Sequence, residues 1–320
     1  MQAMQAFTDL PRPFFALAPM DDVTDTVFRR VVAALAPPDL FFTEFVNVDG
    51  LQSAGRERLV KRIQFTEDEQ PLVAQIWGKD LKNFRKTAAE LVDMGFRGVD
   101  LNMGCPIKAV VHNGCCSALI NDPERAVAII KAVQEGVAGR VPVSVKTRLG
   151  FNGIDLSWHE TLLKQNLAML TIHGRTRKEM SEAPVHWEAI GEIRKLRDKL
   201  APDTLIVGNG DVLTRDEGLE LAEKYCLDGI MIGRGVFHDP FVFAQTSPWN
   251  EYTKQQKLEL FARHIRLFGD TWTNQDRRIA TLNRFCKVYV NGFDDAKELR
   301  ERLMAADSVA ELLGILQKAV

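Results

Sequence analysis

The chain has 320 residues, of which 46% are apolar and 26% charged, a composition typical of a globular protein with a hydrophobic core. Its 41 basic and 43 acidic residues give a net charge of −2, so the overall charge does not favour a nucleic-acid partner. The first nine residues lack a signal-peptide pattern, and no apolar run approaches the ~18 residues that cross a bilayer. With an odd number of cysteines, five, these features predict a cytoplasmic protein that is not membrane-bound.

Short apolar runs alternate with amphipathic, helix-length stretches as far as Pro248. Several runs are continuously apolar, which is typical of parallel strands buried on both faces. Eight such units in roughly 240 residues predict an α/β fold, a (β/α)8 TIM barrel. We expect its strands at residues 14–18, 40–43, 72–76, 98–101, 142–146, 169–173, 204–207 and 229–232.

A doubly wound sheet is the alternative fold. Such sheets usually carry fewer strands and a Gly-x-Gly-x-x-Gly fingerprint. The glycine pairs in residues 208–210 and 233–235 do not complete it, because Leu213 and His238 occupy the position of the third glycine. The barrel is therefore the preferred fold.

Only helical patterns remain after Pro248. Apolar residues recur there at helical spacing, as in Leu258, Phe261, Ile265 and Phe268. We therefore predict two domains, a barrel over residues 1–246 and an all-helical domain over residues 247–320.

Polar residues and glycines follow nearly every predicted strand. In (β/α)8 barrels the residues just past the strands form the active-site face. The glycine-rich turns at residues 208–211 and 233–235 would present backbone N–H groups to an anion, and Arg234 adds a guanidinium suited to phosphate. Such turns can also merely close tight loops, but the pair together with Arg234 favours a phosphate site.

Three side chains at strand ends have the chemistry of functional groups. Lys146 would favour negative charge on a bound ring or carbonyl, unless it only extends to solvent. His173 is either a ligand contact or a structural histidine. Cys105 follows a strand between Gly104 and Pro106, where a thiol can act as a general acid or a nucleophile.

Metal binding is the alternative role for Cys105, because Cys115 and Cys116 follow on the same loop. The sequence holds no Cys-x-x-Cys, and adjacent cysteines rarely bind one zinc ion with good geometry. We therefore expect no metal.

Taken in order, these motifs resemble the tRNA-dihydrouridine synthase family, of the FMN-dependent bacterial type. The resemblance covers almost the whole chain. It rests on residues 18–20, 100–106, 145–150, 173–176, 209–211 and 232–235 and on the helical tail.

The resemblance implies FMN in the barrel mouth, NADPH as the hydride source, and reduction of the C5–C6 double bond of a uridine in tRNA. It implies that Cys105 protonates C5 and that Asn102 positions the uracil. It implies cofactor contacts from Pro19, Met20, Asp21, Gln75, Lys146, His173, Asn209, Gly210, Asp211, Gly233 and Arg234.

A uridine must unstack from its neighbouring bases before it can contact a flavin, so the protein needs a surface that binds RNA. Residues 263–287 hold six basic residues against two acidic ones. Arg277, Arg284 and Lys287 have the spacing of one helical face, and Arg148 and Arg175 on the barrel rim could extend the basic track. A solvated charged face is the alternative. We expect tRNA as partner and a monomer.

Two other functions fit parts of the pattern. One is an FMN barrel that acts on a free pyrimidine, such as a dihydroorotate dehydrogenase, although the motif at residues 173–176 and the helical tail argue against it. The other is a catalytically idle RNA-binding protein. Cys115 and Cys116 depart from the small residues usual in the family, and their role is left open, as is the uridine position.

Overall fold

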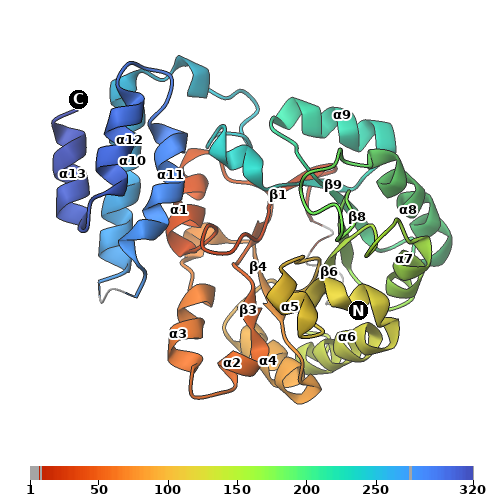
Figure 1. Cartoon of the computed structure of the whole chain (residues 1–320). Coiled ribbons are helices and arrows are strands. Elements are labelled where there is room, and N and C mark those ends of the chain that lie inside the picture. The colour runs from red at the N-terminus through yellow and green to blue at the C-terminus, as the bar shows by residue number, and fades with distance from the viewer. Residues whose placement is uncertain (1–6, 8, 274–275, 320) are drawn as a thin grey trace.

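The computed structural model describes residues 7, 9–273 and 276–319, so most of the N-terminal stretch inspected for a signal peptide lies outside the described residues. A ring of strands occupies one part of the molecule, and the last helices stack on one side of it (Figure 1). The strands are β1 (Phe14–Leu17), β2 (Phe41–Phe42), β3 (Val46–Asn47), β4 (Leu72–Trp77), β5 (Gly98–Met103), β6 (Val143–Arg148), β7 (Met169–His173), β8 (Leu205–Asn209) and β9 (Gly229–Ile232).

The strands form one parallel sheet in the order β1-β9-β8-β7-β6-β5-β4-β2. A bridge between Ala16 and Leu40 joins its two ends and closes the barrel. All eight predicted strands are therefore present, and the predicted barrel is confirmed. The two-residue strand β3, which pairs with β4, is too short to be seen as a sequence pattern.

Helices follow the strands around the outside of the barrel (Figure 1). Their starts have chemical causes: Asp25 accepts the Phe28 N–H, and Asp122 caps a helix whose first residue is Pro123. The helices of the barrel region are α1 (Thr26–Leu35), α2 (Val48–Leu51), α3 (Arg56–Val60), α4 (Leu81–Asp93), α5 (Lys108–His112), α6 (Pro123–Val137), α7 (Leu156–Leu163), α8 (Trp187–Leu200) and α9 (Arg215–Tyr225), with 3-10 helices that include η2 (Lys61–Ile63), η4 (Cys116–Asn121) and η5 (Arg234–Phe237).

Among its described residues, the C-terminal region contains helices joined by loops and no strands. It consists of α10 (Lys254–Thr271), η7 (Ile279–Leu282), α11 (Asn283–Tyr289), α12 (Ala296–Met304) and α13 (Val309–Gln317). This region packs on α1, where the Phe28 ring lies 4.7 Å from the ring of Phe285 and 5.9 Å from that of His264. The boundary at residues 246 and 247 stays a prediction.

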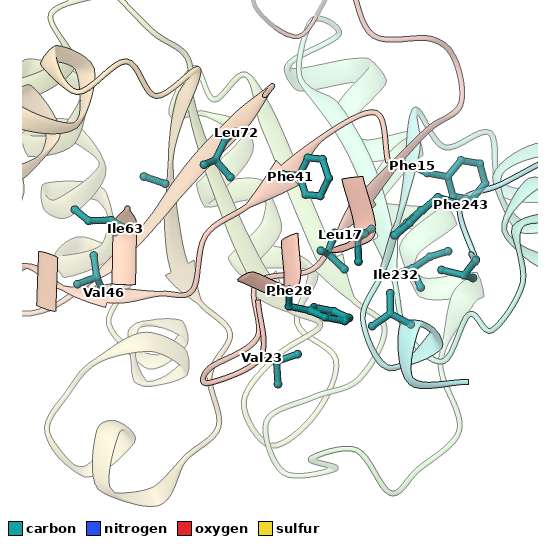
Figure 2. Close-up of a cluster of buried hydrophobic side chains, with 14 of the residues drawn as sticks. Phe15, Leu17, Val23, Phe28, Phe41, Val46, Ile63, Leu72, Ile232 and Phe243 are labelled. Atoms are coloured by element: carbon teal, nitrogen blue, oxygen red, sulfur yellow. The ribbon is translucent and has the colours of Figure 1, made fainter. Parts of the chain in front are cut away.

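The buried core continues from the barrel to this junction. Figure 2 shows Phe28 near Val23, Leu17 and Ile232, which are all buried. Burial of these large side chains, worth about 1.5–3 kcal/mol each, holds α1 between the barrel and the tail. Among the described residues, no helix combines the length and apolar character that a membrane span requires.

Candidate active site

Polar side chains from neighbouring strands meet inside the barrel near the carboxyl ends of the strands. Asn102 of β5 is in register with Lys146 of β6, and Lys146 with Thr171 of β7. Farther along, His173 of β7 is in register with Asn209 of β8. Because alternate residues of a strand share a face, this register gathers the predicted residues at one end of the barrel.

The loop after β5 carries Cys105 and is hydrogen-bonded on both sides. Asn102 Oδ1 accepts the N–H groups of Gly104 and Cys105, at 3.1 and 3.0 Å. Arg148 Nε donates to the Gly104 carbonyl at 2.7 Å, and Ser117 Oγ donates to the Cys105 carbonyl at 2.8 Å. These bonds hold the backbone around the thiol in one conformation.

Cys105 is 9% exposed and packs with Cys115 and Cys116. A hydrogen bond from the Cys116 thiol is the main reason why the pKa of Cys105 falls to about 7, against the effect of burial. The same bond, together with burial, raises the pKa of Cys116, so Cys116 keeps its proton. Cys105 can therefore gain or lose a proton near neutral pH.

Lys146 and His173 bring two basic groups to the barrel interior. Burial lowers the pKa of Lys146 to about 8. Burial also lowers the pKa of His173, and the fields of Lys146 and Arg148 lower it further, so the imidazole is neutral at pH 7. The site thus offers one ammonium group and one neutral ring with a donor and an acceptor.

Asp211 joins two arginines at the ends of β7, β8 and β9. Arg175 and Arg234 each form an ion pair with its carboxylate. The hydrogen bond from Arg175 and then that from Arg234 hold the pKa of Asp211 below its usual range. The Arg234 side chain stays 56% exposed, so it can also reach an anion.

Two predicted glycines lie in turns at the barrel mouth, and a side chain would disturb the first of them, Gly210. Gly210 adopts a φ of +146°, and a Cβ there would lie 2.9 Å from Val185 Cγ1. A Cβ on Gly233 would lie 3.4 Å from Ala18 Cβ and 3.6 Å from Met20 Sδ. The turn after β9 therefore lies against the loop after β1, which contains the buried Pro19.

The predicted amide side chains are already partly bonded. Gln75 Nε2 donates to Asp100 at 2.7 Å, and Asn102 Nδ2 donates to Gln75 Oε1 at 3.0 Å. Asn209 Nδ2 donates to the Met231 carbonyl at 2.8 Å. These bonds orient the amides and leave other donor and acceptor positions for a ligand.

Arg148 and Arg175 do not form a basic track on the barrel rim, and this part of the prediction is wrong. They are 4% and 2% exposed. Arg148 donates to the carbonyls of Gly104 and Thr176, and Arg175 donates to Ala183. Strand-end arginines turn inward here because the loops offer carbonyl groups that need donors.

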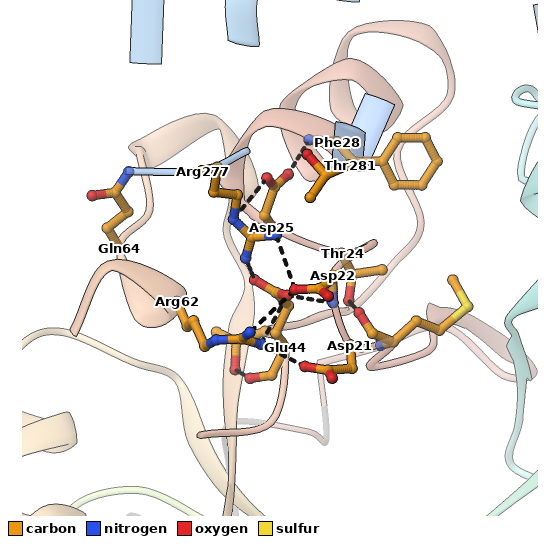
Figure 3. Close-up of polar contacts among 12 residues, drawn as sticks. Asp21, Asp22, Thr24, Asp25, Phe28, Glu44, Arg62, Gln64, Arg277 and Thr281 are labelled. Carbon is orange, nitrogen blue, oxygen red and sulfur yellow. Dashed lines mark hydrogen bonds and ion pairs between the residues drawn. The ribbon is translucent and has the colours of Figure 1, made fainter. Parts of the chain in front are cut away.

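The predicted helical face of Arg277, Arg284 and Lys287 is also wrong. Helix α10 ends at Thr271 and α11 begins at Asn283, so Arg277 precedes both η7 and α11. Only Arg284 and Lys287 share α11, where both are exposed. Arg277 instead reaches the barrel, where it pairs with Glu44 and approaches Asp25 at 3.5 Å (Figure 3).

Asp21, Asp22 and Glu44 form a carboxylate cluster, with oxygen atoms within 4.8 Å of one another. Arg62 contacts Asp21, lies 3.1 Å from Asp22 and lies 3.3 Å from Glu44 (Figure 3). Burial raises the pKa of Glu44 to about 7, although Arg277 and Arg62 lower it. The Asp21 carboxylate thus faces this cluster of ion pairs at the junction with the tail.

Several residues that shape the site were not predicted as site residues, although Asp100 begins the motif at residues 100–106. Asp100 and Ser144 are buried in the barrel, two positions before Asn102 and Lys146. The two-residue period of the strands is the signal that could have found them. Arg62 has no such signal, because its contacts with Glu44 and Asp21 arise only from tertiary structure.

A parallel barrel with a ring of polar groups at the strand ends places this protein among the (β/α)8-barrel enzymes. Solved structures agree on the fold. Morphinone reductase superposes with a TM-score of 0.52 at 13% identity, over 73% of this chain and 85% of that one. Morphinone reductase in complex with tetrahydroNAD gives a TM-score of 0.51 at 13% identity, over 75% and 89%.

Sequence comparison identifies the family. Residues 16–320 match the family described as "Dihydrouridine synthase (Dus)". A "Probable tRNA-dihydrouridine synthase" of Staphylococcus aureus (strain COL) is 49% identical over 315 residues, 98% of this chain and 94% of that protein. "Probable tRNA-dihydrouridine synthase 2" of Bacillus subtilis (strain 168) is 48% identical over 312 residues, 96% and 94%. The chain belongs to the dihydrouridine synthase family and is an oxidoreductase, as the motifs predicted.

Proposed function

We propose that this protein is a tRNA-dihydrouridine synthase that reduces the C5–C6 double bond of a uridine in tRNA, with FMN as prosthetic group and NADPH as reductant. The observation that carries the proposal is the buried Cys105, on a loop that hydrogen bonds with Asn102 and Arg148 hold at the mouth of the barrel. When bound, FMN supplies the hydride that adds to C6 of the uracil ring.

The groups around the barrel mouth fit FMN. The Thr171 hydroxyl is buried in the interior and has no hydrogen-bond partner among the described residues, so a bound polar ring would satisfy it. Lys146 supplies positive charge next to it, and Arg234 supplies a guanidinium for the phosphate. We infer that FMN is held by Pro19, Met20, Asp21, Gln75, Lys146, His173, Asn209, Gly210, Asp211, Gly233 and Arg234.

Cys105 is the proton donor in this proposal. The thiol is protonated in about half of the molecules near its pKa, so donation to C5 of uracil proceeds without a strongly acidic medium. Asn102 holds the loop N–H groups of Cys105 and Gly104 and would position the base.

We assign the RNA-binding surface to the junction between the barrel and the C-terminal helices. A groove of about 400 Å³ there is lined by five basic residues, Arg58, Lys61, Arg62, Arg277 and Arg278, and by Asp22 and Asp276. Lys61, Arg62 and Arg277 pair with carboxylates, so the exposed Arg58 and Arg278 would meet the RNA. Exposed Arg284 and Lys287 lie on the neighbouring α11. Phosphate groups need such local positive charge even when the whole protein is nearly neutral.

We place the enzyme in the cytoplasm, as a monomer that takes tRNA as its macromolecular partner. The five cysteines are free in the structure, as suits a reducing compartment.

Anaerobic titration tests the proposal against its rivals. Protein reconstituted with FMN and reduced by NADPH should be reoxidised by tRNA transcripts and yield dihydrouridine, while orotate and dihydroorotate leave the flavin unchanged. Reoxidation by orotate would instead indicate an enzyme of free pyrimidines. A protein that binds tRNA but never takes up FMN would be an idle RNA-binding protein.

A further inference from the structure

Three adjacent strands place polar side chains in one buried row. Gln75 of β4 is in register with Asp100 of β5, and Asp100 with Ser144 of β6. Ser144 Oγ donates to Asp100 Oδ1 at 2.5 Å, and Gln75 Nε2 donates to Asp100 Oδ2 at 2.7 Å. All three residues are fully buried, so each polar atom depends on partners inside the barrel.

The row continues from Gln75 to the Cys105 loop. Gln75 Oε1 accepts from Asn102 Nδ2, and Asn102 Oδ1 accepts from the N–H groups of Gly104 and Cys105. We propose that Asp100 is a positioning residue, which sets the orientation of the Gln75 and Asn102 amides and thereby the conformation of the Cys105 loop. The link to catalysis rests on the proposed function, whereas the link to the loop does not.

The chemical reason is that a carboxylate accepts hydrogen bonds and cannot donate them. Asp100 therefore draws the NH2 group of Gln75 toward itself and leaves the Gln75 oxygen to face Asn102. Asn102 must then present its NH2 group to Gln75 and its oxygen to the loop. Reversing Asn102 would set its NH2 group against the N–H groups of Gly104 and Cys105, and reversing Gln75 would set its NH2 group against that of Asn102. Either change leaves a buried mismatch.

Ser144 makes this chain of hydrogen bonds tolerant of one change but not of two. A hydroxyl can donate or accept, so in Asp100→Asn the new NH2 group can donate to Ser144 while the new oxygen keeps Gln75 in place. In Ser144→Ala the Asp100 carboxylate still accepts from Gln75. In the double variant the NH2 group introduced at position 100 has no acceptor at position 144, and the orientation of the amides is lost.

A double-mutant cycle measured by amide hydrogen exchange tests the proposal. We expect exchange of the peptide covering residues 103–107 to stay within about twofold of wild type in Asp100→Asn and in Ser144→Ala, and to quicken about tenfold or more in the double variant. Asp100→Asn with Ser144→Thr retains the hydroxyl and should behave as Asp100→Asn alone. The strands β7 and β8, away from the row, should exchange at wild-type rates in every variant.

Additive effects, or faster exchange throughout the barrel, would overturn the proposal, because a residue that only stabilises the fold gives that pattern. Uridine reduction and flavin content are measured in parallel. The double variant should lose turnover per bound flavin, and it should also hold flavin less tightly, because the reoriented Gln75 is a proposed FMN contact. If wild-type protein reduces no tRNA, the proposed function fails, and the exchange data still decide the role of Asp100.

Should the double variant not fold, Ser144→Ala alone gives the test. Burial raises the pKa of Asp100 to about 6, and Lys146 is the charged neighbour that lowers it. A protonated Asp100 can donate to Ser144. In the wild-type protein the amides of the loop should therefore stay protected from exchange below pH 6, when their exchange rates are compared with those of β8. In Ser144→Ala that acceptor is gone, and loss of the Ser144 hydrogen bond also raises the pKa of Asp100. Protection of the loop should therefore fall as the pH falls, with a midpoint above that pKa. Equal profiles would contradict the proposal.

Discussion

Arg277, in the segment before the last helices, forms an ion pair with Glu44, a buried residue just beyond β2. The two residues are 233 positions apart in the chain. This pair, with the approach of Arg277 to Asp25 at 3.5 Å, ties the helical region to the barrel beside the loop after β1. Arg277 therefore stabilises the junction, and the RNA-binding surface depends on its more exposed neighbours.

Replacing Arg277 by Gln should destabilise the protein in a pH-dependent way. Above the pKa of Glu44, about 7, the buried carboxylate is charged and loses its closest cation, so the free energy of unfolding should fall by about 3 kcal/mol. Below that pKa the carboxyl group is neutral and the loss should be smaller. Urea denaturation at pH 6 and pH 8.5 measures both values.

Glu44→Gln is the companion variant. The folded pKa of Glu44 lies above its ordinary value of 4.5, so its contribution to stability is present below pH 4.5 and is lost as the pH rises through about 7. The Gln variant should lack this decline and should show little further effect of Arg277→Gln. Arg278→Gln, at an exposed position, is the control, and an equal loss there would contradict the ion-pair account.

Cys105→Ala should separate the two halves of the reaction. Flavin binding and flavin reduction by NADPH do not need the thiol, so both should remain at wild-type levels. Uridine reduction should fall about 10²–10⁴-fold, the usual worth of a general acid. Stopped-flow reoxidation of the reduced flavin by tRNA measures the loss, and a wild-type rate would show that Cys105 is not the acid.

Cys116→Ala should raise the pKa of Cys105. The hydrogen bond from the Cys116 thiol is the largest cause of the low value, so its removal favours the neutral thiol of Cys105. Alkylation of Cys105 by iodoacetamide, followed by peptide mass spectrometry, should reach its half-maximal rate at a higher pH. Cys115→Ala is the matched control, because the Cys115 thiol donates to the Gly78 carbonyl and should leave the midpoint in place.

Charge reversal of Lys287 to Glu should weaken tRNA binding without loss of flavin. Arg277 and Arg284 stay intact in this variant, because both contact the acidic cluster of Asp21, Asp22 and Glu44. Each lost phosphate contact should lower the slope of log K against log salt by about 1. Filter binding at several salt concentrations measures the affinity and the slope. Lys195→Glu on α8 is the control, and salt-independent binding in all variants would remove α11 from the RNA surface.

Most of the barrel could be predicted because its strands have a local signal. Runs such as residues 169–173 and 229–232 are apolar enough to be buried on both faces, and the structure has strands at those bounds. The ends of β5 and β6 extend past their predictions, to Met103 and Arg148. Asn102, Thr147 and Arg148 are polar residues in these extensions, so the apolar pattern stops before the strand does.

The candidate site was predictable for the same reason. Asn102, Lys146 and His173 stand at or near strand ends, and closure of a parallel barrel brings such positions together. The role of Asp100 could not be predicted in this way, because it depends on which side chains its carboxylate contacts. Its partners Gln75 and Ser144 come from two other strands, and only the register shows that the three are neighbours.

The sequence by itself determined the barrel, the helical tail, the family and the loop that carries Cys105, because these depend on local patterns and on motifs in order. Only the tertiary structure decided which charges are free to meet RNA. Arg148, Arg175 and Arg277 look like surface residues in the sequence, yet folding supplies each with carbonyl or carboxylate partners far away in the chain. Spacing along a chain predicts helical faces only where the helix continues, and here the helix ends at Thr271. The net charge of −2 likewise does not reveal the groove lined by basic residues. The net charge is a sum over the whole protein, whereas RNA binding depends on the charge of one face.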